Sequence, residues 1–155
     1  MEKNFQQWAK EKINIEKKDS YKIFCKKREI WMAKIGVNIG NESSKDSPFF
    51  RPILILETSM GGDLILGIPL TSQYNEKMNK FLVPISHPKL LKKSFVQLNQ
   101  VKIFSRKRLE RNFDIKISSE ELYTIKNRLQ EKVLKPRLSE KTHSIVNRIS
   151  NENLN

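Results

Sequence analysis

Apolar residues fall into two different patterns along this chain of 155 residues, and the patterns divide it into segments. Near the start, apolar groups recur every three to four residues, and no glycine or proline interrupts them. This spacing predicts a helix from Glu2 to about Lys18, and residues 19–28 follow it as a linker. The predicted stripe consists of Phe5, Trp8, Ile15 and the stem of Lys12.

Short apolar runs then alternate with turn-forming residues. Gly61 and Gly62 separate two of these runs, and strand-like runs joined through Gly-Gly indicate a β-hairpin. The segment 36–50 is rich in Asn, Asp, Ser, Gly and Pro, so it is predicted as a loop. The runs predicted as strands are 29–35, 51–57, 64–70, 81–85, 94–98 and 101–104.

Helical spacing returns in the segment 118–133. Ser118 and Glu121 are spaced as a capping box, which is typical of a helix start. Pro136 ends the pattern, and a further short helix is expected over Ser139–Ile149. The apolar stripe of the main helix consists of Leu122, Ile125, Leu129 and Val133.

Strands clustered between helices predict an α+β fold, mainly β, with an antiparallel sheet. No segment is long enough for repeated βαβ crossovers, and the number of short strands favours a small, strongly bent barrel. We therefore expect an N-terminal helical extension and linker (1–27), a barrel domain with its closing helix (28–133), and a C-terminal tail (134–155).

The chain is strongly basic, with 30 Lys and Arg against 17 Asp and Glu, a net charge of +13. Residues 29–133 hold 17 basic and 11 acidic residues, so +6 belongs to the predicted barrel and the rest to the flanks. Such a charge favours a polyanionic partner, namely RNA, DNA or a very acidic protein. A Lys-rich composition without any specific partner would give the same count.

Several classes are disfavoured by composition. Cys25 is the only cysteine, which excludes an internal disulfide and favours a reducing compartment. No apolar run approaches the roughly 20 residues of a membrane span, and the start of the chain lacks a signal-peptide core. We therefore expect a cytoplasmic protein without a membrane partner.

Metal and cofactor chemistry are not indicated either. His87 and His143 lie far apart, and neither is flanked by another ligand type. His87 sits in a Ser-His-Pro-Lys turn, where a solvated loop residue is the simpler interpretation. Nucleotide-binding glycine motifs and Cys/His clusters do not occur. We expect no metal and no cofactor.

Four blocks, taken in order, resemble the MazF/PemK family of bacterial toxins. They are REIWMAKIGVNIGNE (28–42), RPILILE (51–57), IPLTSQ (68–73) and SFVQLNQVKIFSRKRL (94–109), and a closing amphipathic helix follows them. The extension before the first block is similar to that of a subgroup of these toxins. The resemblance covers about two-thirds of the chain.

The resemblance implies an SH3-like, CcdB-type antiparallel barrel, usually a homodimer. It also implies a metal-independent, sequence-specific endoribonuclease that acts on single-stranded RNA and is held in check by an acidic antitoxin. The cleavage residues of the family correspond to Arg51 and Thr71 in this sequence. By the same correspondence, Gln73 and Gln100 are expected to contact RNA, and so is Asn41, which stands where a Ser is common.

Further groups that would border Arg51 can bind RNA through charge, backbone amides or stacking. The aromatic pair Phe49 and Phe50 is equally compatible with burial against the barrel, and the lysines with a solvated loop. These additional candidates are Lys45, Phe50, Ser72, Lys77 and Lys80.

The expected reaction uses the 2′-hydroxyl of RNA itself as nucleophile, with Arg51 stabilising the charged transition state. Its products would carry a 2′,3′-cyclic phosphate and a 5′-hydroxyl, and the general base is unassigned. Two alternatives stay open. One is a non-catalytic nucleic-acid-binding module of the same fold. The other is a gyrase-directed CcdB-like poison, which the ending Asn-Glu-Asn-Leu-Asn disfavours because those relatives end in a Trp-Gly-Ile-like sequence.

Overall fold

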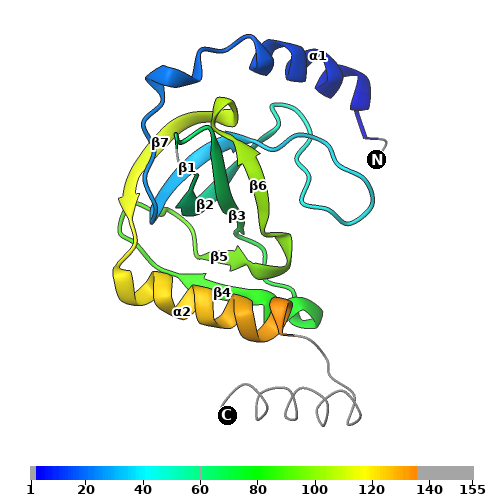
Figure 1. The fold of residues 1–155 in the computed structure, drawn as a ribbon. Helices are drawn as coiled ribbons and strands as arrows, with labels where there is room; N and C mark the ends of the chain where they lie inside the picture. Colours follow the sequence, from blue (N-terminus) through cyan, green and yellow to red (C-terminus); the bar gives the residue numbers. More distant parts are fainter. Residues whose placement is uncertain (1–2, 60, 136–155) are drawn as a thin grey trace, which may run out of the picture.

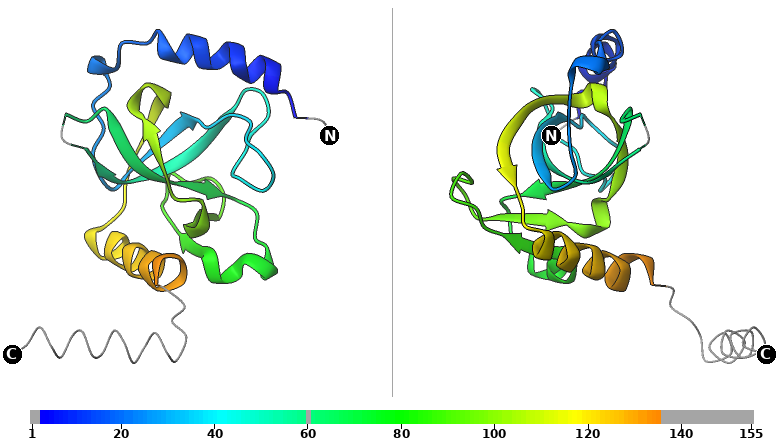
Figure 2. Two further views of the ribbon diagram at one scale, coloured as in Figure 1. Left: turned by 45° about the vertical axis from the view of Figure 1, so that its right-hand side comes forward. Right: turned by 60° about the vertical axis from the view of Figure 1, so that its left-hand side comes forward.

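The computed structural model describes residues 3–59 and 61–135 as a bent antiparallel sheet with one helix at each end of the chain. Helix α1 (Phe5–Glu16) lies across one side of the sheet, and α2 (Ser119–Leu129) packs against the opposite side (Figure 1). Two further views show how the strands curl around an interior (Figure 2). This architecture confirms the predicted α+β fold with its barrel-like sheet.

Seven strands form the sheet in the order β4-β5-β3-β2-β1-β7, and β6 also pairs with β3. Strand β3 pairs with β6 along Leu64–Gly67 but with β5 at Leu70 and Thr71. One edge of β3 thus serves two different partners while its other edge pairs with β2, and the sheet bends where the two partners exchange. The strands are β1 (Glu29–Lys34), β2 (Phe50–Thr58), β3 (Leu64–Thr71), β4 (Leu82–Ile85), β5 (Ser94–Gln97), β6 (Lys102–Ser105) and β7 (Leu109–Lys116).

The central strand β2 is buried on both faces. Ile53 and Ile55 pack inside the curved sheet with Trp31 and Phe104, whereas Leu54 and Leu56 join the cluster beneath α2. The hairpin predicted from Gly61 and Gly62 is confirmed, because β2 pairs antiparallel with β3 across that turn. A strand buried on both faces has a continuous apolar sequence rather than an alternating one, as this strand does.

Helix α2 follows the sequence prediction closely. The Ser118 hydroxyl accepts a hydrogen bond from the Glu121 backbone at 3.0 Å, and the Glu121 carboxylate accepts one from the Ser118 backbone at 2.8 Å. Both halves of the capping box are therefore present. Its buried side chains are Leu122, Ile125 and Leu129, and a wider π turn (Gln130–Leu134) follows.

Helix α1 agrees with its prediction only in part. It begins at Phe5, after Asn4 caps it by accepting a hydrogen bond from the Gln7 backbone at 2.9 Å. Trp8 and Ile15 are buried as predicted, but Phe5 is 48% exposed, so its place in the buried stripe was wrong. Lys12 is exposed as well, so its assignment to this stripe was also wrong. The buried apolar contact of this helix with the barrel thus consists of two side chains rather than a whole stripe.

Strand β7 was not predicted. Its inward positions Leu109 and Ile115 are buried, but polar residues separate them and two register shifts interrupt its pairing with β1. Asp114 adopts a left-handed backbone conformation with φ of 55°, which further breaks the alternation. Local irregularity of this kind erases the period-two signal on which a strand prediction depends.

The expected helix Ser139–Ile149 and the stop at Pro136 lie outside the described residues. Within the ranges 3–59 and 61–135, no helix combines the length and the apolar character that crossing a bilayer requires.

The packing of α2 generates a stability prediction. Ile125 is 1% exposed, so Ile125→Ala should lower the free energy of unfolding by about 2–5 kcal/mol, because the deleted methyl groups leave a cavity. Urea denaturation followed by circular dichroism measures this change. Tyr123→Ala, on the same helix but 68% exposed, should change it by less than about 0.5 kcal/mol. Equal losses in both variants would contradict the assigned packing.

Candidate functional site

The register of β2 and β3 brings the two cleavage candidates together. Ile53 and Pro69 form the last pair of this ladder, and Arg51 and Thr71 each lie two residues beyond it, at the same end of the two strands. Both line an open cleft of about 460 Å³. The cleft is lined by Lys45, Phe50, Arg51, Pro52, Leu70, Thr71, Ser72, Gln73, Lys89, Leu90, Leu91, Lys92, Ser94 and Phe113.

Neutral oxygens hold the Arg51 guanidinium. Its Nη2 donates to the Ser44 carbonyl at 2.9 Å, and its Nη1 lies 3.4 Å from the Leu70 carbonyl and 3.5 Å from Gln97 Oε1. Its Nε is buried without a hydrogen-bond partner. Arginine normally binds carboxylate or phosphate through such a fork of donors. The side chain is thus held in place while part of its donor capacity is unused.

Arg51 is also a half-buried cation without a nearby negative charge. None of the ion pairs formed among residues 3–59 and 61–135 includes it. Burial lowers its pKa from the usual value, because removal of water disfavours the charged form. An anion bound in the cleft would supply the missing charge.

Thr71 lies at the end of β3 and begins a turn. Its hydroxyl oxygen accepts a hydrogen bond from the Gln73 backbone at 3.1 Å. The hydroxyl hydrogen is therefore directed elsewhere and can be donated to a ligand. Ser72 and Gln73 are exposed beside it and line the same cleft.

The remaining lining combines positive charge with apolar surface. Lys45 and Lys92 are exposed, and Lys89 donates to the Asp114 carbonyl at 3.0 Å. Phe50 and Phe113 add aromatic surface, and the residues that line the cleft include no Asp or Glu. Of the aromatic pair considered from sequence, Phe50 borders the cleft, whereas Phe49 is 2% exposed and belongs to the core beneath α1.

Four predicted RNA contacts lie outside this lining. The Gln100 side chain binds the 36–50 loop. It accepts a hydrogen bond from the Ser43 backbone at 2.7 Å and donates one to the Asn41 carbonyl at 3.2 Å. Lys77 and Lys80 are exposed on the 3₁₀ turn Glu76–Phe81. The cleft therefore brings together Lys45, Phe50, Arg51, Thr71, Ser72 and Gln73, but not Asn41, Lys77, Lys80 or Gln100.

Sequence reasoning missed several residues at this site. Gln97 was inside a quoted block, but nothing in its spacing indicated a contact with Arg51. Lys89, Lys92 and Phe113 reach the cleft from the β4–β5 loop and from β7. The Lys92-Lys93 pair was the available signal, and only the fold shows that this loop borders Arg51.

Metal ligands do not gather in the described part of the chain, where no group of three or more His, Cys, Asp or Glu residues is suitably placed. His87 Nδ1 accepts a hydrogen bond from the Lys89 backbone at 3.2 Å, which agrees with its assignment to a turn. Cys25 is half-buried, and burial raises the pKa of its thiol.

Solved structures with the same fold include bacterial toxins. An endoribonuclease from a mycobacterial species, solved in complex with its cognate antitoxin, aligns with a TM-score of 0.52 and 12% identity over 74% of this chain and 100% of that chain. MazF from Deinococcus radiodurans aligns with a TM-score of 0.56 and 15% identity, covering 69% and 94% of the two chains. A MazE–MazF structure from the same organism aligns with a TM-score of 0.53 over the same shares, at 15% identity.

None of the curated protein sequences matches this chain significantly. The model of the PemK-like, MazF-like toxins of type II toxin–antitoxin systems matches residues 26–133, which span all seven strands and α2. This match covers more than half of the chain and includes both Arg51 and Thr71. The chain therefore belongs to the PemK-like, MazF-like family of type II toxin–antitoxin toxins.

Proposed function

We propose that this toxin is an endoribonuclease that cleaves single-stranded RNA at specific sequences, with mRNA in the cytoplasm as its substrate. The observation that carries the proposal is Arg51, a half-buried guanidinium held by neutral oxygens within a basic cleft. A phosphodiester is the anion that fits this position, because its oxygens match the planar fork of donors. Unpaired bases would stack on Phe50 and Phe113 while Lys45 and Lys92 contact neighbouring phosphates.

In the proposed reaction the RNA 2′-oxygen attacks the adjacent phosphorus and the bond from phosphorus to the 5′-oxygen breaks. The 2′-hydroxyl loses its proton and the leaving 5′-oxygen gains one, so the products carry a 2′,3′-cyclic phosphate and a 5′-hydroxyl. Substrate alignment supplies much of the rate, since the nucleophile is already tethered beside the phosphate. The protein mainly has to stabilise the added negative charge.

Arg51 suits charge stabilisation rather than proton abstraction. Although burial lowers its pKa, a guanidinium keeps its proton at neutral pH and is a poor acceptor. It would donate hydrogen bonds to the nonbridging and leaving oxygens as their charge grows. Thr71 would donate one more from its free hydroxyl hydrogen. No residue is assigned as general base.

The family and its solved relatives also support proposals about partners. The fold is shared with a mycobacterial endoribonuclease solved with its cognate antitoxin and with the MazE–MazF structure. We propose that this toxin also has an antitoxin, and that an acidic segment of it competes with RNA for the basic cleft. A homodimer is proposed on the family resemblance.

Cleavage should not depend on added metal. The positive charge of Arg51 is part of the protein, so the purified toxin should cut a long single-stranded RNA in excess EDTA at defined sites. Mass spectrometry of the fragments should find 2′,3′-cyclic phosphate and 5′-hydroxyl ends. Strict dependence on a divalent cation would contradict this mechanism, and binding without cleavage would favour a non-catalytic RNA-binding module.

The charge and the fork of Arg51 can be tested separately. Arg51→Ala should lower kcat by about 10²–10³-fold, the typical cost of removing a transition-state donor. Arg51→Lys should recover part of that loss, because it keeps the charge but not the paired donors. The matched control is Arg128→Ala on α2, which should leave kcat unchanged. Cleavage of a fluorogenic RNA at saturating substrate measures these effects, and an active Arg51→Ala variant would contradict the proposed role.

The lysines of the cleft should contribute to RNA affinity rather than to the rate of cleavage. Lys92→Gln should raise KM while kcat stays within about twofold, and the salt dependence of RNA affinity should decrease by about 0.7 in log–log slope for each lost phosphate contact. Lys22→Gln removes the same charge from an exposed turn beside α1 and is the matched control. Identical slopes for Lys92→Gln and the wild type would place the RNA elsewhere.

A further inference from the structure

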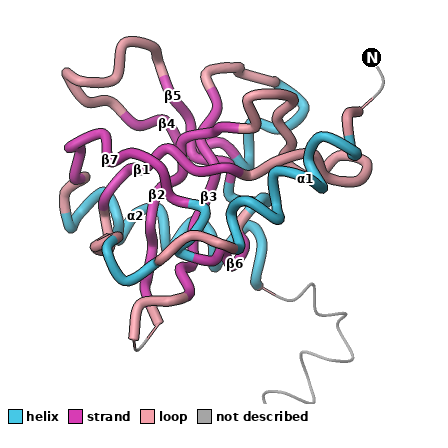
Figure 3. Tube along the Cα trace, turned by 90° about the horizontal axis from the view of Figure 1, so that it is seen from above, coloured by secondary structure: helices cyan, strands magenta, loops and turns pink. Residues whose placement is uncertain are grey.

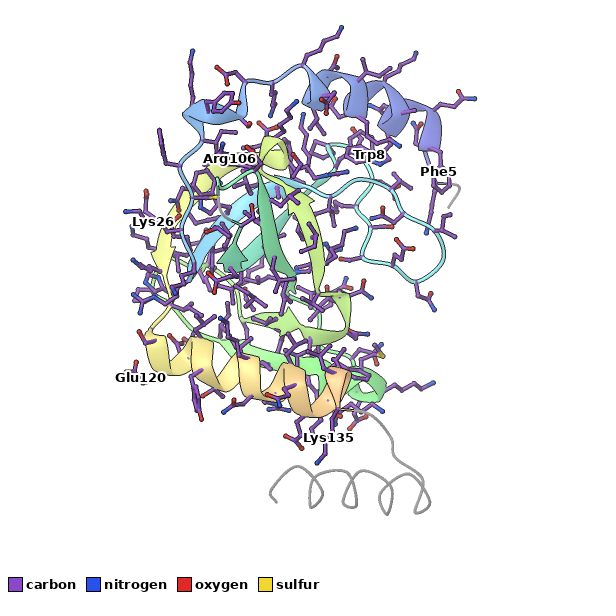
Figure 4. The ribbon with its side chains drawn as sticks, viewed as in Figure 1. Phe5, Trp8, Lys26, Arg106, Glu120 and Lys135 are labelled. Carbon is purple, nitrogen blue, oxygen red and sulfur yellow. The ribbon has the colours of Figure 1, made fainter. Side chains whose placement is uncertain are left out.

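Helix α1 packs on the loop of residues 36–49, and Lys45 of this loop lines the cleft. Trp8 is 4% exposed, and its ring centroid lies 5.2 Å from that of Phe49. Gly36 lies beneath the same indole, since a Cβ at this glycine would approach Trp8 Cε2 to 1.9 Å. The Arg108 guanidinium lies over the Trp8 ring, with its Cζ 5.4 Å from the ring centroid. Figure 4 shows Trp8 on the side of α1 that faces the barrel.

Polar contacts from the extension reach the same loop. Lys3 Nζ donates to the Asn38 carbonyl at 2.6 Å and to the Gly40 carbonyl at 2.9 Å. Asn38 in turn donates from Nδ2 to the Ser43 carbonyl at 2.6 Å and from its backbone to the Ser44 hydroxyl at 2.8 Å. Seen from above, α1 runs along the side of the molecule from which this loop projects (Figure 3).

A second chain of contacts leads from Trp8 to Ser44, the residue that the contacts of Lys3 and Asn38 also reach. Gly36, beneath the indole, accepts a hydrogen bond from the Lys45 backbone at 2.8 Å, and Lys45 directly follows Ser44. Both routes therefore end at Ser44. Its carbonyl accepts from Arg51 Nη2 at 2.9 Å, which is shorter than either contact of Nη1. The loop thus supplies the shortest of the three hydrogen bonds that hold the guanidinium, and a shift of the loop would lengthen or break it.

The loop is poorly suited to hold this shape alone. Phe49 has a φ of 69° and Gly36 a φ of 75°, and the left-handed region is unfavourable for an aromatic residue. Val37 and Phe49 are buried in a cluster completed by Trp8 and Ile15 of α1, so removing the helix would expose them. On the barrel side, Gln100 binds the loop at Ser43 and Asn41.

We propose that the N-terminal extension is a positioning element for cleavage: Trp8 of α1 and Lys3, just before the helix, clamp the 36–49 loop and thereby hold Arg51 in its reactive orientation. The inference rests on the proposed ribonuclease function for its kinetic consequence. It assigns a role to residues that lie outside the matched family region of 26–133. The extension contributes no group to the reaction itself.

The clamp predicts a loss of turnover rather than of binding. Trp8→Ala in the full chain should lower kcat by about 10–100-fold, because a displacement near 1 Å can cost that much, and should change KM by less than about threefold. Trp8→Phe retains an aromatic ring and should restore most of kcat. Lys3→Ala should lower kcat by less than Trp8→Ala does. Lys3→Arg keeps a cationic donor at this position and should retain a kcat close to that of the wild type.

Two controls, one on α1 and one on the turn that contacts its far end, separate clamping of the loop from general loosening of the helix. Lys107→Ala removes the contacts of Lys107 Nζ with the Glu16 carbonyl at 2.6 Å and carboxylate at 2.8 Å, so it frees the other end of α1 without touching the loop. Ile13→Ala changes a side chain that is 58% exposed. Both variants should keep wild-type kcat. Losses equal to that of Trp8→Ala would overturn the proposal.

Two further measurements do not depend on activity. Amide hydrogen exchange at Ser43 and Lys45 should accelerate at least tenfold in Trp8→Ala, while exchange in β2 stays unchanged and shows that the barrel is folded. The NMR signal of Arg51 Nε–H, assigned from its loss in Arg51→Lys, should shift or broaden in Trp8→Ala but not in Lys107→Ala.

The outcomes distinguish the clamp from the ribonuclease. If the wild-type toxin does not cleave RNA, the proposed function fails, while exchange and the Arg51 signal still support or refute the clamp. If the wild type cleaves RNA and Trp8→Ala keeps its kcat although the loop exchanges faster, the clamp is overturned and the ribonuclease stands. Unchanged hydrogen exchange in the loop together with an unchanged Arg51 signal in Trp8→Ala would also overturn the clamp.

Discussion

The antiparallel pairing of β2 with β3 is the constraint on which the rest of this structure depends. It buries four consecutive residues of β2, Ile53–Leu56, whose side chains alternate between the inside of the sheet and the cluster beneath α2. The same pairing carries Arg51 and Thr71 to one end of the ladder, where both line the cleft. A shift by one residue would move the apolar side chains to the wrong faces and also separate these two groups. Stability and the candidate site therefore depend on one pairing.

The site itself is organised around a charge that the protein only partly compensates. The Arg51 guanidinium is half-buried and is held by carbonyl and amide oxygens, and burial lowers its pKa. Full neutralisation by a carboxylate would stabilise the empty site, but it would weaken any attraction for a phosphate. A fixed cation surrounded by neutral acceptors stays available to an incoming anion. The lysines around it attract the same kind of ligand, which is what the proposed competition between RNA and an acidic antitoxin segment requires.

Much of this arrangement follows from local sequence. The β2–β3 hairpin was predictable because Gly61 and Gly62 provide left-handed turn conformations between two apolar runs. Helix α2 was predictable because its cap and its stripe involve residues three or four positions apart. Strand β7 was not, because its bulges and the left-handed Asp114 remove the alternation that marks a strand. The role of Gln100 was not evident for a different reason, because its partners Ser43 and Asn41 lie more than fifty positions away.

The sequence alone determined the class of fold, the hairpin, the closing helix and, through the four family blocks, the two residues Arg51 and Thr71. Those features depend on short-range periodicity, on turn chemistry, or on motifs that keep their order. Only the tertiary structure decided what surrounds Arg51: Gln97 from β5, the Ser44 carbonyl from the folded loop before β2, and the lysines of the β4–β5 loop. It also decided that Trp8 covers Gly36 and Phe49. Such contacts join residues far apart in the chain, and their geometry exists only when the sheet has bent and the helix has docked on it.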